Sequence, residues 1–272
     1  MLAKHTTYKI MEKQMRPFSK NMFESELAEF YDLMRQYRDY DLESKFADII
    51  IQNCYPNAKN VLDIFCGTGE HAIKMAQRGY VVTGIDASQD MINLAEEKTK
   101  KAGVSIDYHC TDIKNFIPTS KYDAAYCLGY TFLYMLTHSD VLDFFKIIHD
   151  ILVPEGVFLV DFINGWSLIK GLDRDKYFYQ NEKVKITQFE QLTLNKQERL
   201  IHIEYCYLLD YDNGHVKTIS AEEDVRIFFD DEVQTLMNIC GFNNIKSYGD
   251  YKLADKKSAD VPNIVIVVGQ KK

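Results

Sequence analysis

The sequence predicts an α/β fold, with a doubly wound, mostly parallel sheet and a set of antiparallel strands inserted late in the chain. Short apolar segments alternate with helical patterns between residues 60 and 163. This alternation is typical of βαβ units, whose strands pair in parallel. Between residues 183 and 228 the apolar period changes from about 3.6 to about 2, which indicates a β-meander.

Residues 1–58 are predicted to form an N-terminal helical lid. The first 20 residues are polar and weakly patterned. From Glu24 to Gln52 apolar and aromatic residues recur at spacings of three and four, which is typical of one face of a helix. They are Leu27, Phe30, Tyr31, Met34 and Tyr37. Pro56 and Asn57 end this pattern.

Residues 59–165 form the predicted core, with strands at 60–65, 80–86, 104–110, 122–129 and 157–163. A helix is expected from Gly69 to Arg78, because the helical pattern starts directly after the glycines. Ser88 is expected to cap a second helix that Gly103 ends. The third helix, at 139–151, carries a continuous apolar stripe, and Pro154 and Gly156 separate it from the last strand.

Residues 166–228 are predicted to form a loop and a β-meander cap, and residues 229–272 to complete the core. The stretch "LIHIEYCYLLD" alternates apolar and polar residues, and Asn213-Gly214 favours a tight hairpin turn because both residues tolerate positive φ. A helix at 230–240 and strands near 244–248 and 262–268 follow.

The composition is that of an ordinary globular protein rather than a nucleic-acid-binding or membrane protein. The chain has 272 residues, 46% of them hydrophobic, and a formal net charge of −8. A nucleic-acid partner would call for a basic face, and no apolar run approaches the roughly 20 residues of a membrane span. The six cysteines show no CxxC pair, so we expect reduced thiols, no metal site and a cytoplasmic protein of undetermined oligomeric state.

The segment Gly67-Thr68-Gly69-Glu70-His71-Ala72 lies at a strand–helix turn and matches the pattern G-x-G-x-x-A. Glycines at this position let the phosphates or sugar of an adenosine-containing cofactor approach the backbone. The same pattern is also compatible with a plain tight turn, or with a nicotinamide cofactor.

Three acidic residues follow successive predicted strands, and together they favour one cofactor class. Asp63 lies inside the first strand, where a nicotinamide fingerprint keeps apolar residues. Asp86 ends the second strand, at the right distance to accept hydrogen bonds from two ribose hydroxyls. Asp112 follows the third strand, where it can accept from an adenine amino group beside Ile113. Each of these acids alone would also suit a helix cap or a solvated loop.

These segments resemble the motifs of the class I S-adenosylmethionine-dependent methyltransferases. "VLDIFCGTG" resembles the first motif of that family, "VTGIDAS" the second, "CTDI" the third and "YDAAYCLG" the fourth. The resemblance covers residues 25–165 and, by topology, the final helix and two strands. It implies a Rossmann-like sheet of seven strands, S-adenosylmethionine as the cofactor and S-adenosylhomocysteine as its product.

The resemblance also implies a set of cofactor contacts. The methionine end lies against the glycine loop and the edge of the fourth strand, and the lid helix meets the cofactor carboxylate. The implied cofactor-binding residues are Tyr31, Arg38, Asp63, Cys66, Gly67, Thr68, Gly69, Asp86, Ala87, Met91, Asp112, Ile113, Cys127, Leu128 and Gly129. A nicotinamide-dependent oxidoreductase is the alternative, but no candidate hydride-transfer acid accompanies it.

Asp161 is the candidate catalytic residue, because it interrupts the apolar strand "VFLVDFI". It is interpreted either as a group that holds a cationic acceptor or takes its proton, or as a structural carboxylate that caps a loop or pairs with a lysine. Aromatic residues after the fourth strand and ahead of the meander suit an acceptor pocket, or equally core packing. The predicted substrate-binding residues are Phe18, Tyr130, Phe132, Asp161, Asn164 and Tyr179.

The acceptor is predicted to be a small-molecule or short-peptide cation. By general likeness the whole chain is similar to the plantazolicin-type peptide N-methyltransferases, which dimethylate the N-terminal arginine amine of an azole-containing peptide antibiotic. An amino sugar, a small amine or a hydroxyl of a metabolite remains open as the acceptor. A non-catalytic cofactor-binding protein is a further alternative.

Overall fold

The computed structural model describes residues 26–172, 176–253 and 261–272. Contacts within the chain divide it into two compact units. Among the described residues, one unit comprises 26–171, 225–253 and 261–272, and the other comprises 172 and 176–224. The described parts of the lid segment and of the C-terminal segment therefore belong to the same unit as the predicted core.

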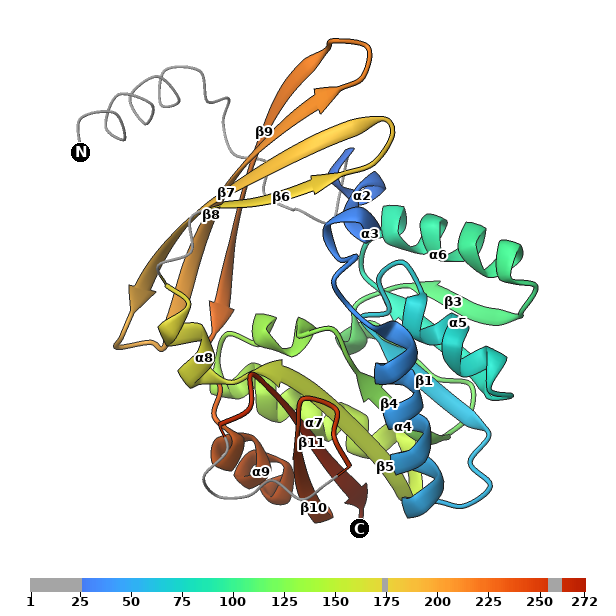
Figure 1. The fold of residues 1–272 in the computed structure, drawn as a ribbon. Helices are drawn as coiled ribbons and strands as arrows, with labels where there is room; N and C mark the ends of the chain where they lie inside the picture. The colour runs from blue at the N-terminus through green and yellow to red at the C-terminus, as the bar shows by residue number, and fades with distance from the viewer. Residues whose placement is uncertain (1–25, 173–175, 254–260) are drawn as a thin grey trace. The chain divides into compact units, whose positions relative to one another are not determined.

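The larger unit is built on a seven-stranded sheet with the strand order β10-β11-β5-β4-β1-β2-β3 (Figure 1). The strands are β1 (Asn60–Ile64), β2 (Val81–Asp86), β3 (Ile106–Cys110), β4 (Tyr122–Cys127), β5 (Leu152–Ile163), β10 (Phe242–Gly249) and β11 (Ile264–Lys271). Strands β1 to β5 are parallel, and β11 is antiparallel to both β5 and β10. This arrangement confirms the predicted mostly parallel sheet. The strand order reverses between β1 and β4, and ligands bind at such a point in open α/β sheets.

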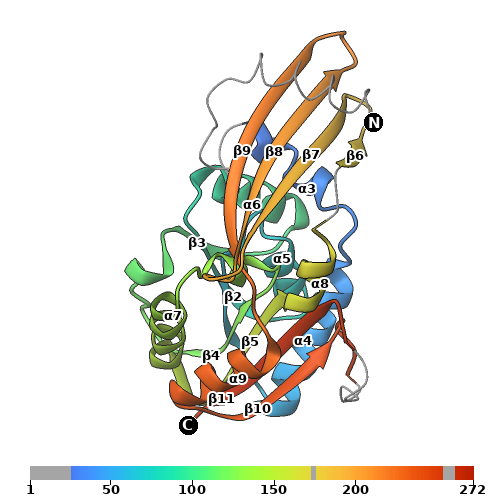
Figure 2. The same ribbon diagram turned by 90° about the vertical axis from the view of Figure 1, so that its left-hand side faces the viewer.

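Helices cover both faces of this sheet. They are α2 (Glu26–Glu29), α3 (Tyr31–Met34), α4 (Tyr40–Cys54), α5 (Glu70–Gln77), α6 (Gln89–Ala102), α7 (His138–Ile151), α8 (Gly165–Lys170) and α9 (Asp230–Ile239), with 3-10 turns η1 (Ile113–Asn115) and η2 (Thr131–Tyr134). Helices α4, α5 and α6 lie on one face, and α7 and α9 lie on the other (Figures 1 and 2). Residues of α4 and α5 pack with β1, β4 and β5 into one core cluster.

The predicted helix caps are present. The Ser88 side chain accepts a hydrogen bond from the Met91 amide at 3.3 Å, and Gly103 ends α6 with a φ of 69°. Such caps satisfy backbone groups that lack a partner at the helix ends.

The lid segment and the start of β5 differ from the sequence prediction. The continuous helical pattern at 24–52 contains three separate helices, because the Asp39 side chain accepts from the Leu42 amide at 3.0 Å and starts α4 anew. Strand β5 begins at Leu152 rather than at 157, since Leu152 pairs with Tyr122 before a register irregularity. Periodicity alone does not show either feature.

The smaller unit is a four-stranded antiparallel sheet with the order β6-β7-β8-β9. Its strands are β6 (Lys176–Gln180), β7 (Val184–Asn195), β8 (Leu200–Tyr211) and β9 (Val216–Arg226). The predicted hairpin turn is present, with a φ of 81° at Gly214 and a hydrogen bond of 2.9 Å from the His215 amide to the Asn213 side chain. Within the described ranges of the whole chain, no helix is both long enough and apolar enough to cross a membrane.

Candidate active site

The loop between β1 and α5 adopts a conformation that suits glycine. The φ angles are 54° at Gly67 and 78° at Gly69, in the left-handed region that L side chains rarely adopt. The Gly69 amide donates to the Cys66 carbonyl at 2.9 Å and closes the turn. A Cβ added at Gly67 would meet no atom within 4 Å, so this backbone is open to a close ligand.

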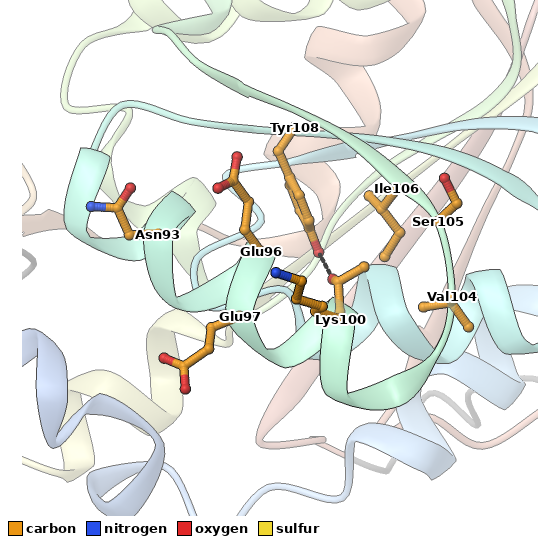
Figure 3. Close-up of a pocket in the computed structure, with 9 residues that line it drawn as sticks. Asn93, Glu96, Glu97, Lys100, Val104, Ser105, Ile106 and Tyr108 are labelled. Atoms are coloured by element: carbon orange, nitrogen blue, oxygen red, sulfur yellow. Dashed lines mark hydrogen bonds between the residues drawn. The ribbon is translucent and has the colours of Figure 1, made fainter.

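Gly69 and Gly84 are required for a different reason, which is the packing of Tyr108. A Cβ at Gly69 would contact the Tyr108 hydroxyl and would lie 3.0 Å from the Ala95 Cβ. A Cβ at Gly84 would lie 2.7 Å from carbons of the Tyr108 ring. The hydroxyl also lies 3.0 Å from the Thr99 Oγ1 (Figure 3). The second glycine of the fingerprint therefore makes room for a side chain of β3.

A groove of about 540 Å³ lies between α6 and β3, with Tyr108 along it (Figure 3). Its lining residues are Asn93, Glu96, Glu97, Thr99, Lys100, Val104, Ser105, Ile106 and Tyr108. None of the predicted cofactor-binding residues lines this groove. Its size alone therefore does not make it the functional site.

A second cavity, of about 30 Å³, brings together seven of the predicted cofactor-binding residues. They are Tyr31, Arg38, Cys66, Gly67, Thr68, Leu128 and Gly129. Five lining residues were not predicted, namely Tyr40, Phe65, Glu70, His71 and Thr131. The lid segment, the glycine loop and the turn after β4 thus meet at the point where the strand order reverses.

Asp63 lies beneath the glycine loop as a buried carboxylate with an unsatisfied oxygen. It is 1% exposed, and its Oδ2 has no hydrogen-bond partner among the described residues. Burial, together with the nearby charge of Asp86, raises the pKa of the Asp63 carboxyl well above its usual range, against the opposing effect of the Tyr126 hydroxyl and the Ala72 amide. An orphaned buried carboxylate oxygen favours a cationic or hydrogen-bond-donating partner. Together with the open backbone at Gly67, this fits the amino-acid end of S-adenosylmethionine.

Asp86 joins the glycine loop to the turn after β2 through its two carboxylate oxygens. Its Oδ2 accepts from the Gly67 amide at 2.9 Å, and its Oδ1 accepts from the Ser88 amide at 2.9 Å. Burial raises the pKa of Asp86, and these backbone donors oppose that shift. Since a carboxylate offers about four lone-pair sites, Asp86 keeps acceptor capacity for the hydroxyls of a ribose.

Asp112 is exposed and caps η1, where it accepts from the Lys114 amide at 2.8 Å. Ile113 beside it is 2% exposed. Of the other predicted contacts, Ala87 is exposed, whereas Met91 and Cys127 are 1% and 0% exposed. The last two side chains lie in the interior, and the contact of these residues with the cofactor stays a prediction.

A buried ionic network that the sequence did not reveal lies behind the cavity. The Glu43 Oε2 lies 2.6 Å from the Arg38 Nη2 and 2.7 Å from the His71 Nε2. Burial opposes ionisation of Glu43, but the bonds to His71 and Arg38 outweigh it and lower its pKa. The Arg38 guanidinium also lies 4.4 Å from the centre of the Tyr130 ring. The sequence analysis did not predict Glu43, because this residue lies in a helix with an ordinary amphipathic pattern and looks like any other acid of its polar face.

Asp161 and Phe132 are both fully buried, which differs from their predicted place at the acceptor site. Asp161 is 0% exposed, and its carboxylate accepts from the Gly129 and Tyr130 amides at 3.1 and 2.8 Å and from the Tyr251 hydroxyl. It thus presents no surface to an acceptor, and the structural interpretation of this residue fits better. Phe132 is also 0% exposed and stacks on Phe228 at 4.5 Å, inside the core.

The remaining acceptor candidates have varied positions. Tyr130 is half-buried beneath Arg38. Asn164 is 5% exposed and caps α8, since its side chain accepts from the Trp166 amide at 3.1 Å. Tyr179 is half-buried in the smaller unit, and Phe18 lies outside the described residues. Their contact with an acceptor stays a prediction.

The lid segment is fastened to the glycine loop by a polar cluster around Lys98. Asp32 of α3 accepts from the Lys98 ammonium at 2.7 Å and from the Thr68 hydroxyl at 2.6 Å. Lys98 also pairs with Glu70 at 2.5 Å. Pockets for ligands of this size usually measure about 300–1,000 Å³, far more than the small cavity beneath α3. We therefore expect α3 to shift against this cluster when the cofactor enters.

Replacement of this lysine is expected to weaken the closed position of α3. In Lys98→Met, the dissociation rate of S-adenosylhomocysteine should rise by about twofold to fivefold. This is the change in rate expected when one partly exposed ion pair, which contributes about 0.5–1 kcal/mol, is lost. Stopped-flow fluorescence at low and high salt measures this rate, and high salt should reduce the difference. The control is Lys101→Met on the same helix, whose pair with Glu97 is 73% and 60% exposed. Equal dissociation rates for both variants would contradict the assignment.

Comparisons with known proteins agree with this geometry. Residues 61–156 match the methyltransferase domain family. The glycine/sarcosine N-methyltransferase of Halorhodospira halochloris is 27% identical over 89% of this chain and 87% of its own length. An S-adenosylmethionine-dependent methyltransferase from Clostridium acetobutylicum superposes with a TM-score of 0.76 at 20% identity, over 89% of this chain and 96% of that chain.

A second solved structure is an amino pentose methyltransferase from Micromonospora echinaspora with bound S-adenosylmethionine. It superposes with a TM-score of 0.71 at 18% identity, over 93% of this chain and 100% of that chain. The two superpositions show a shared fold, and the matched domain contains the glycine loop, Asp63, Asp86 and Asp112. The chain is an S-adenosylmethionine-dependent methyltransferase, with its methyltransferase domain at residues 61–156.

Proposed function

We propose that the enzyme methylates the amine nitrogen of a small metabolite, and that this metabolite is an amino sugar. The likeness to the amino pentose methyltransferase carries this proposal, because it spans 93% of this chain. The unmatched 7% amounts to roughly 19 of 272 residues, fewer than the 49 residues of 176–224. The match therefore includes most of the inserted antiparallel sheet, the part that differs from a minimal methyltransferase core.

In this proposal the cofactor lies along the carboxyl ends of β1, β2 and β3. Bound S-adenosylmethionine supplies an electrophilic methyl group on a sulfonium. Arg38 and Tyr31 hold its carboxylate, and Asp63 holds its ammonium group. Asp86 accepts from the ribose hydroxyls, and Asp112 accepts from the adenine amino group. Each assignment pairs a charge or an acceptor with the complementary group of the ligand.

The residues around the cavity align the acceptor and do not attack the methyl group. Burial and the charges of Asp63 and Asp86 raise the pKa of the Cys66 thiol well above its ordinary value. Burial likewise raises the pKa of the Tyr130 hydroxyl. Both groups therefore stay protonated at neutral pH, which leaves the neutral amine of the acceptor as the nucleophile. Orientation of this kind can lower a barrier by about 7–11 kcal/mol.

The second candidate acceptor is the N-terminal arginine amine of an azole-modified peptide. The general resemblance of the sequence to the plantazolicin-type enzymes suggests it, and the net charge of −8 favours a cationic ligand. With Asp161 buried, the charge partner for such a substrate would have to be another acidic residue.

A labelled-methyl assay over an acceptor panel tests the proposal. The panel holds nucleotide-linked amino sugars, glycine and sarcosine, azole peptides with an N-terminal arginine, and hydroxyl analogues of the sugars. We expect transfer to an amino sugar at least tenfold faster than to its hydroxyl analogue, because only the amine is a competent nucleophile in the same pose.

The outcomes of this assay are distinct. Transfer to the arginine peptide alone would replace the amino sugar by the second candidate, and transfer to hydroxyls alone would overturn N-methylation. Binding of S-adenosylhomocysteine without transfer to any acceptor would indicate a non-catalytic protein. Gly67→Ala serves as the cofactor-blocked control, because its Cβ would occupy the open side of the loop.

A further inference from the structure

The buried Asp161 carboxylate joins three separate segments of the larger unit. Its Oδ1 accepts from the Tyr130 amide at 2.8 Å, and its Oδ2 accepts from the Gly129 amide at 3.1 Å. The Tyr251 hydroxyl donates to the same Oδ2. The Arg38 Nη2 lies 3.8 Å away. These contacts connect β5 to the turn after β4, to the lid segment and to the segment after β10.

The turn that Asp161 holds is strained. Gly129 has a φ of 106° and Tyr130 a φ of 66°. For a residue with a side chain, the left-handed region costs roughly 1–2 kcal/mol, so Tyr130 needs compensation from its surroundings. Two charge-assisted bonds from one carboxylate to consecutive amides supply it. The turn would relax towards ordinary φ values without them.

This turn forms one wall of the cofactor cavity, together with Arg38. Gly129 and Arg38 both line the cavity. A Cβ at Gly129 would lie 3.5 Å from the Arg38 Nη1, which shows how closely the two walls approach. The guanidinium is 4% exposed, lies 2.6 Å from the Glu43 carboxylate and lies over the Tyr130 ring. Asp161 therefore controls the turn and contributes to the placement of the arginine.

Tyr251 fixes the carboxylate itself. It is 6% exposed, and its ring packs edge-on against Phe46 of α4 at 5.6 Å. The hydroxyl therefore reaches Asp161 from a ring that cannot easily rotate. Removal of this one donor would free the carboxylate without opening a large cavity.

We propose that Asp161 and Tyr251 are positioning residues, which set the Gly129–Tyr130 turn and Arg38 against the cofactor and do not contact the methyl acceptor. This inference rests on the place of the cofactor at the glycine loop and is independent of which acceptor the enzyme uses. Their loss should displace the cofactor carboxylate and the sulfonium relative to the acceptor. Cofactor affinity and kcat should then fall together, while the KM for the acceptor stays the same.

The test compares Tyr251→Phe with Tyr80→Phe. Tyr80 is a matched control, since it is 7% exposed and its hydroxyl donates to the Asp48 carboxylate at 2.7 Å, away from the cavity. Calorimetric titration with S-adenosylhomocysteine should show a Kd raised threefold to tenfold in Tyr251→Phe and unchanged in Tyr80→Phe. Thermal unfolding of both variants separates this effect from a loss of stability. Asp161→Asn is the stronger variant, because an amide presents a donor to groups that are themselves donors; its Kd should rise by more than tenfold.

Two results would overturn the proposal. If Tyr251→Phe lowers the Tm as Tyr80→Phe does and leaves the Kd of S-adenosylhomocysteine unchanged, the network only supports the fold. If Asp161→Asn is folded and raises the acceptor KM without a change in this Kd, Asp161 contacts the acceptor after all. The titration needs no acceptor, so a failure of the amino-sugar assay would leave it interpretable.

Discussion

Asp63→Asn is expected to make the protein more stable and, at the same time, a much poorer binder of its cofactor. The wild-type carboxylate is buried, has an oxygen without a partner among the described residues and lies near a second acid. Asparagine removes the charge and keeps the shape. We expect the Tm at pH 7 to rise by about 2–4 °C, the shift that about 1 kcal/mol gives in a protein of this size. The Kd of S-adenosylmethionine should rise at least tenfold, because the partner of its ammonium group is lost.

The gain in stability should depend on pH in a defined direction. The pKa of Asp63 is raised in the folded protein, whereas in the unfolded chain it is about 3.9. Below that value both states are protonated and ionisation costs nothing. As the pH rises from there through the raised pKa, only the unfolded state ionises readily, so wild-type stability falls. The difference in Tm between variant and wild type should therefore be small near pH 4, grow through this window and level off above it.

Asp123→Asn is the matched control for Asp63→Asn. Its carboxylate accepts from the Lys59 and Asn60 amides at 2.8 and 2.9 Å, at the opposite end of β1. This variant should lose stability and retain cofactor affinity. A loss of stability in Asp63→Asn as well would show that the Asp63 carboxylate is satisfied within the apoprotein.

The two glycines of the loop are expected to respond in opposite ways to alanine. Gly69→Ala combines left-handed strain with contacts against Tyr108 and Ala95, so it should lose about 2–5 kcal/mol of stability. Gly67→Ala faces open space and should lose only about 1–2 kcal/mol. Its Cβ would instead fill the side at which the cofactor approaches, so cofactor affinity should fall by at least tenfold. Urea unfolding and calorimetric titration measure the two quantities.

A second substitution identifies the cause of the damage at Gly69. Combined with Tyr108→Phe, Gly69→Ala should regain part of the lost stability, since the hydroxyl that its Cβ contacts is gone. The strain of the φ of 78° would remain. An equal loss of stability in Gly67→Ala and Gly69→Ala would show that backbone strain alone decides both positions.

The fold was predictable wherever the pattern was local. Ser88, Gly103 and the Asn213-Gly214 turn act through neighbours in the chain, and the structure places them as predicted. The division of the lid pattern into three helices was not predictable from periodicity. It depends on a cap by Asp39, a residue that looks like any other acid in an amphipathic helix.

The cofactor end of the site was predictable for a topological reason. Strands that run parallel bring their carboxyl ends to one edge, so the residues that follow β1, β2 and β3 must gather there. Seven of the predicted residues line one cavity; they come from the lid segment, the loop after β1 and the turn after β4, whereas the predicted residues after β2 and β3 do not line it. Glu43 and His71 were missed, because a single sequence does not show which helix face meets the glycine loop.

The sequence by itself determined the order of strands and helices along the chain and the glycine loop, because each depends on residues close together in the chain. The acids that accompany successive strands, with the motifs around them, indicated the class of reaction. The tertiary structure alone decided that Asp161 is satisfied by Gly129, Tyr130 and Tyr251, and that Tyr108 is the reason for Gly69. A buried carboxylate in a strand is costly without partners, and its partners here lie about 30 and 90 positions away in the chain. Only the packed fold brings such distant donors together. It therefore also decides whether a carboxylate touches the substrate or holds the site in place.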